Sequence, residues 1–131
     1  MDPILAGASV MVTILATKAL EKTGEIFGEA VIDCGRKVLE SLRHKLPDTV
    51  KLLEDPSAKE LDYVQVIETV KIEADKDPHL AQLLQELALE AQKDSKFSEF
   101  ISQKPTVYNA VKLAEYIKNV FQGNTIIGGN F

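Results

Sequence analysis

The pattern of apolar and polar positions predicts a protein built from helices, and the first helix begins almost at the first residue. Residues 3–17 carry no charge, and apolar or small side chains fill nearly every position. Asp2 suits the N-cap of a helix, and Pro3 suits its first turn, where a missing N–H costs nothing. The stretch is too short to cross a bilayer comfortably, because a crossing takes about 20 apolar residues. We therefore expect a buried helix over residues 3–17.

Residues 18–46 place apolar or small side chains at steps of four and three, the spacing of a helix that packs along one stripe. This stripe comprises Leu20, Gly24, Phe27, Val31, Cys34, Val38 and Leu42. On such a helix Gly24, Gly28 and Gly35 would share one face, which would allow close packing against another helix or a bend. The first 45 residues are thus expected to form one long helix, with or without a kink, or a pair of helices.

The rest of the chain shows further helical segments separated by proline. These are a short helix at 48–55, a helix at 57–75, the clearest helix at 78–94, a short connector at 95–103 and an amphipathic segment at 105–121. Ser57 with Glu60 forms a capping box, and Asp77 precedes a proline at the start of the clearest helix. The predicted fold is all-α: an antiparallel four-helix bundle over residues 1–118, followed by a flexible tail at 119–131.

Composition and charge narrow the function classes. The chain has 131 residues, 45% of them hydrophobic, which suffices for one domain with its own core. Acids and bases balance over residues 1–45, so the whole net charge of -5 lies in the remainder, without a basic tract. This distribution argues against nucleic-acid binding. The single cysteine, Cys34, has apolar neighbours at helical spacing, so we expect a buried structural thiol.

No motif indicates an enzyme. His44 and His79 have no partner at metal-ligand spacing, and neither has a nucleophile beside it in the sequence. The glycines form no phosphate-binding loop. The carboxylates are spread along helix faces, as expected for a solvated surface. We therefore expect no catalytic residues, no cofactor and no metal.

The end of the chain differs from all that precedes it. After Lys118 no residue is charged, and "NVFQGNTIIGGNF" contains no proline. Apolar pairs between Asn and Gly are typical of segments that stack in register as cross-β structure. A disordered terminus would explain the same composition equally well. The residues of this candidate amyloid tail are Gly123, Asn124, Ile126, Ile127, Gly128, Gly129, Asn130 and Phe131.

Taken together, the "MDP" start with its apolar helix, the glycine-bearing second segment, the helical bundle and the Asn/Gly/Ile tail resemble the bacterial Bell domains. Bell domains are analogues of the fungal HeLo cell-death domains, and they are similar in design to the four-helix executioner domains of necroptotic pseudokinases and plant resistance proteins. In this family a receptor with a matching amyloid motif templates the tail. The bundles then come together, and the N-terminal helix is released to permeabilise a membrane.

The resemblance implies a membrane-permeabilising cell-death effector in bacterial immunity, cytoplasmic at rest and moving to the inner face of the plasma membrane. Its partners would be membrane lipid, further copies of itself and a receptor with a matching motif. An alternative from the residues alone is a soluble helical adaptor or oligomerisation module that recruits a protein without membrane activity. The residues expected to act on the membrane are Ile4, Leu5, Val10, Met11, Ile14 and Leu15.

Overall fold

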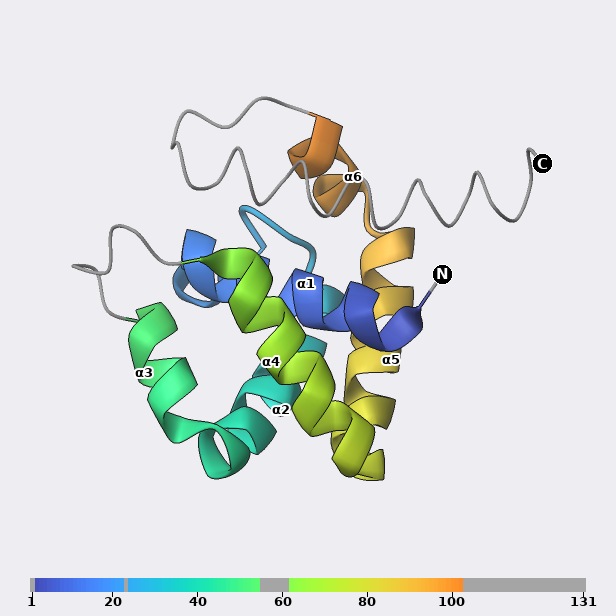
Figure 1. The fold of residues 1–131 in the computed structure, drawn as a ribbon. Helices are drawn as coiled ribbons and strands as arrows, with labels where there is room; N and C mark the ends of the chain where they lie inside the picture. The colour runs from blue at the N-terminus through green and yellow to red at the C-terminus, as the bar shows by residue number, and fades with distance from the viewer. Residues whose placement is uncertain (1, 23, 55–61, 103–131) are drawn as a thin grey trace.

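The computed structural model describes residues 2–22, 24–54 and 62–102, and within these ranges the chain forms only helices (Figure 1). This confirms the all-α helical bundle expected from the sequence. The elements are α1 (Pro3–Thr17), the 3-10 helix η1 (Ala19–Lys22), α2 (Glu29–Lys45), α3 (Pro47–Glu54), α4 (Tyr63–Lys76), α5 (Pro78–Lys93) and α6 (Ser95–Ser102).

Helix α1 lies at the centre of the bundle. It contacts α2, α3, α4 and α5, and Figure 1 shows it running across α4 and α5. Every residue from Ala6 to Leu15 is buried. A helix that is apolar on all sides must be enclosed on all sides, so the other helices pack around α1. The expected buried helix at 3–17 is confirmed, with the predicted caps: Asp2 is the N-cap and Pro3 the first residue.

Helices α2 and α5 each turn one apolar stripe toward the core around α1. On α5, Leu80, Leu84, Leu87, Ala88 and Ala91 are buried, and Leu83 is half-buried. From α2 the core receives Val31, Ile32, Val38, Leu39 and Leu42. These residues follow the period of 3.6 that the sequence displays, so burial of one face accounts for both helices.

The first 45 residues form two separate α-helices, which settles a question that the sequence left open. Helix α1 ends at Thr17, because Lys18 takes the left-handed conformation with φ 58°. The backbone N–H of Lys18 then donates to the carbonyls of Ile14 and Leu15, which closes the helix C-terminus. The helix η1 and a turn follow, and α2 begins after Gly28.

The predicted glycine face does not exist in this fold. Gly24 lies in the turn with φ 81°, Gly28 is the N-cap of α2, and only Gly35 lies inside an α-helix. Leu20 lies in η1 and Phe27 in the turn before α2, so the two apolar positions do not share one α-helix. Glycine favours the turn because it adopts positive φ without the penalty that a Cβ imposes.

The start of α4 is also corrected. The structure begins this helix at Tyr63, after an N-cap at Asp62 whose side chain accepts from the backbone N–H of Gln65 at 3.2 Å. The expected helix at 57–75 is therefore not continuous through Asp62, whose backbone is extended. The capping box of Ser57 and Glu60 lies outside the described residues. The short helix α3, the start of α5 after Asp77, and α6 match the prediction. The expected helix at 105–121 and the tail at 119–131 lie outside the described residues.

Candidate functional site

The residues expected to act on a membrane are brought together on α1, but the structure encloses most of them. Val10, Met11 and Ile14 are fully buried, and Leu15 is 7% exposed. Ile4 and Leu5, at the N-terminal end of the helix, are half-buried against the core. In this fold the candidate helix is thus the centre of the core.

Helix α1 satisfies its own polar side chains. Its three hydroxyls each donate to the carbonyl four residues earlier: Ser9 to Leu5 at 2.8 Å, Thr13 to Ser9 at 2.9 Å and Thr17 to Thr13 at 2.7 Å. These bonds stay within one helix, so no hydroxyl of α1 depends on a neighbouring helix. The helix can therefore exchange one apolar environment for another without leaving a hydroxyl unpaired.

Two glycines allow the neighbouring helices to approach α1 closely. A Cβ on Gly7 would clash with the backbone carbonyl of Leu84 on α5. A Cβ on Gly35 of α2 would come 2.9 Å from the Cδ1 atom of Ile14. Sequence reasoning missed Gly7, although one signal was present: it is the sole glycine in the uncharged segment 3–17, and a small residue in an apolar helix often marks a close crossing.

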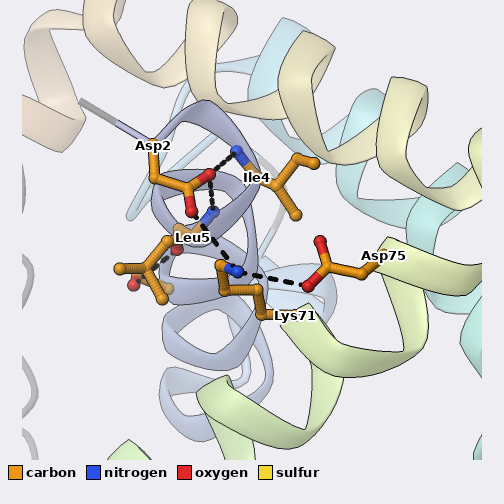
Figure 2. Close-up of polar contacts among 6 residues, drawn as sticks. Asp2, Ile4, Leu5, Lys71 and Asp75 are labelled. Carbon is orange, nitrogen blue, oxygen red and sulfur yellow. Dashed lines mark hydrogen bonds and ion pairs between the residues drawn. The ribbon is translucent and has the colours of Figure 1, made fainter.

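The N-terminal end of α1 is tied to α4 by an exposed ionic contact (Figure 2). The Oδ1 atom of Asp2 accepts from the N–H groups of Ile4 at 3.0 Å and Leu5 at 3.2 Å, and its Oδ2 atom lies 3.6 Å from the Nζ atom of Lys71. Lys71 also lies 3.2 Å from the carboxylate of Asp75. The pKa of the Lys71 ammonium is raised, mainly by the carboxylate of Asp75 and to a smaller extent by that of Asp2.

At the other end, the turn that follows α1 and η1 is bound to α6 through a group of contacts that we call the α6 clasp. The carboxylate of Asp94 accepts from the backbone N–H of Gly28 at 3.0 Å. The ammonium of Lys96 donates to the carbonyl of Gly24. The ring of Phe27 is fully buried and lies 5.6 Å from the ring of Phe97 and 5.4 Å from the ring of Phe100, centroid to centroid.

A shallow groove of about 660 Å³ lies elsewhere on the surface, between α2 and α5. It brings together His44 and His79, which the sequence analysis treated as isolated, with the ion pair of Lys45 and Asp77 at 3.5 Å. A hydrogen bond from the Leu80 N–H lowers the pKa of Asp77, and Lys45 lowers it further. Within the described ranges no three His, Cys, Asp or Glu side chains are grouped as metal ligands would be.

Cys34 lies on α2 and is half-buried, as part of the apolar packing around the core. Burial raises the pKa of its thiol above the ordinary value of 9.0, and the nearby carboxylate of Glu90 raises it further. A thiol with a raised pKa stays protonated at neutral pH and is a poor nucleophile. The thiol is half-buried, less than the buried thiol expected from the sequence.

The length of α1 limits what it can do in a bilayer. Its fifteen residues span about 22 Å at 1.5 Å per residue, against a hydrocarbon core of about 30 Å. Among the described helices, none is both long and apolar enough to cross a membrane.

No protein-family model, no curated protein and no solved structure matches the chain. The resemblance to the Bell domains therefore stays a prediction that rests on the sequence features named above.

Proposed function

We propose that this chain is a membrane-permeabilising cell-death effector of bacterial immunity, in which α1 is stored in the bundle and later enters the membrane. The observation that supports this function best is the chemistry of α1. It is uncharged and apolar on all sides, and its hydroxyl groups donate to carbonyls of the same helix. Asp2 caps its N-terminus, and the backbone N–H of Lys18 donates to carbonyls at its C-terminus. Such a helix is stable in two environments only, a protein core or lipid.

The energetics of α1 explain why a trigger is needed. Moving apolar surface into water costs about 25 cal/mol per Å², so α1 does not leave the core spontaneously. Because α1 contacts four other helices, its departure also removes the centre around which they pack. In the proposed mechanism, templated stacking of residues 119–131 on a receptor with a matching motif supplies the driving force and gathers several copies.

Gathering of copies also compensates for the length of α1. A helix about 8 Å shorter than the hydrocarbon core thins the bilayer around it, and this cost is shared when several helices insert together. The proposed membrane-active state is therefore an assembly of several α1 helices that disrupts the bilayer, rather than one helix that crosses it.

The test is release of a dye from anionic liposomes. Four preparations are compared: the full chain and residues 1–118, each without and with preformed fibrils of a 119–131 peptide. We expect the fibrils to raise release by the full chain, and we expect residues 1–118 to release nothing when fibrils are added. No release from any preparation, with a discrete complex of fixed stoichiometry in its place, would favour the adaptor function.

A substitution in α1 must leave the resting fold intact. Asp at Val10 or Ile14 would bury an unpaired charge in the core and unfold the chain, so it cannot separate folding from membrane action. Leu5 is half-buried in the first turn of α1, where the helix dipole favours a negative charge. We expect Leu5→Asp to fold but to lower fibril-triggered dye release severalfold. The matched control is Leu89→Asp on α5, whose side chain is 53% exposed.

A further inference from the structure

We infer that Asp94 is an autoinhibitory contact: its carboxylate ties the connection between α1 and α2 to α6 and thereby keeps α1 in the bundle. This inference rests on the proposed function for its consequence at the membrane. Its structural part, that Asp94 holds α1 in place, can be tested without any membrane.

Asp94 acts on the N-terminal ends of two helices at once. It is the residue between α5 and α6, and its Oδ2 atom accepts from the N–H of Phe97 in the first turn of α6 at 3.0 Å. The same oxygen accepts from the N–H of Gly28, the N-cap of α2, at 3.0 Å. Gly28 has no side chain to cap α2, so a carboxylate from a distant part of the sequence takes this role. A negative charge at both helix starts is favoured by both helix dipoles.

The local backbone is shaped around this carboxylate. A Cβ on Gly28 would lie 2.5 Å from the Oδ1 atom of Asp94, closer than real Cβ atoms approach an oxygen. Glycine at this position therefore serves the contact with Asp94. This gives a second way to disturb the contact, because Gly28→Ala displaces the carboxylate while Asp94 itself is unchanged.

The contact restrains α1 because little free chain separates them. After α1 ends, Ala19 of η1 is fully buried and Leu20 packs against the core. In the turn that follows, the ring of Phe27 packs against two rings of α6, and the N–H of Gly28 donates to Asp94. The C-terminal end of α1 is thus joined to α6 through a segment in which Ala19, Leu20 and Phe27 pack against the core. For α1 to leave with η1, the turn must first separate from α6.

The experiment measures amide hydrogen exchange of the full chain in the absence of lipid and fibrils. The variants are Asp94→Ala, Asp94→Asn and Gly28→Ala. The matched control is Asp62→Ala, which removes a capping carboxylate that accepts from Gln65 within its own helix. We expect Asp94→Ala and Gly28→Ala to speed exchange in α1 and in the first turn of α2 by roughly tenfold relative to α4. Asp94→Ala removes both hydrogen bonds to the charged group, and Gly28→Ala displaces the carboxylate from the N–H of residue 28. Asp94→Asn keeps the shape and one acceptor, so its increase should be smaller.

The outcomes separate this inference from the proposed function. The inference would be overturned if the Asp94 and Gly28 variants increased amide exchange in α1 no more than Asp62→Ala does. This holds independently of the result of the dye-release experiment. If Asp94→Ala fails to fold, Asp94→Asn decides, and wild-type exchange in α1 of that variant would equally overturn it. Faster exchange in α1 together with dye release in the absence of fibrils supports both. Faster exchange without release under any condition supports the restraint by Asp94 and contradicts the membrane function.

Discussion

The two ends of α1 are held by different chemistry. At the N-terminal end the tie is an exposed carboxylate and ammonium, Asp2 and Lys71, whose attraction is screened by water and salt. Beyond the C-terminal end the α6 clasp combines a fully buried aromatic ring with a carboxylate shared by two backbone N–H groups. Buried packing of this kind contributes far more to stability than an exposed ion pair. The end toward α6 is therefore the one that decides whether α1 stays.

The largest expected effect comes from the buried ring of the clasp. Phe27→Ala removes a side chain that is 0% exposed and that contacts two other rings. We expect it to lower the free energy of unfolding by about 3–5 kcal/mol, the usual cost of deleting a buried Phe. Urea denaturation followed by circular dichroism measures this loss. A loss below about 1 kcal/mol would contradict the view that the clasp is the stronger of the two ties.

The next effect tests the close crossings in the middle of α1. Gly7→Ala would gain up to about 1 kcal/mol of helix propensity, but its Cβ would meet the backbone of Leu84, which cannot move without moving α5. We expect a net loss of about 1–3 kcal/mol in the free energy of unfolding. Gly35→Ala is the matched control, because its Cβ would meet only the end of the Ile14 side chain, which can rotate. Equal losses in both variants would show that the backbone contact at Gly7 does not matter.

These glycines also show what the sequence could and could not predict. The starts of α1 and α5 were predicted correctly, because each depends on an Asp-Pro pair whose capping geometry is local. The role of Gly28 was not predictable in this way. It is set by Asp94, 66 residues away, and no local pattern reveals which carboxylate will reach a given N–H.

The difference between local signals and contacts between distant residues also explains the errors within the helical segments. Apolar spacing in steps of three and four continued from Leu20 to Phe27, although the chain turns there. Phe27 is buried by rings of α6, so its burial reflects a contact between distant segments rather than a helix face. Likewise, the cap at Asp62, which starts α4, was not predicted from the sequence. The burial of α1, in contrast, was predicted from its uncharged composition alone.

A smaller effect is expected from the N-terminal cap. Asp2→Ala removes two hydrogen bonds to backbone N–H groups and the contact with Lys71, and we expect it to lower the free energy of unfolding by about 1 kcal/mol. The faster amide exchange should be confined to the first turn of α1. If exchange increased along the whole of α1 as strongly as in Asp94→Ala, the two ends would restrain the helix equally, and the contrast between them would be lost.

The smallest effect concerns Lys71 itself and is best seen through pH. The pKa of its ammonium is raised above 10.5, so it stabilises the fold fully at lower pH, and the contribution is lost as pH rises through the raised pKa. Lys71→Met should therefore have a slightly lower urea midpoint than the wild type at pH 7, and the two midpoints should converge above pH 10.5. Asp75, in the same helix, raises the pKa more than Asp2 does. Asp75→Asn should consequently remove more of this difference than Asp2→Asn, because most of the attraction on Lys71 stays within α4 and little of it restrains α1.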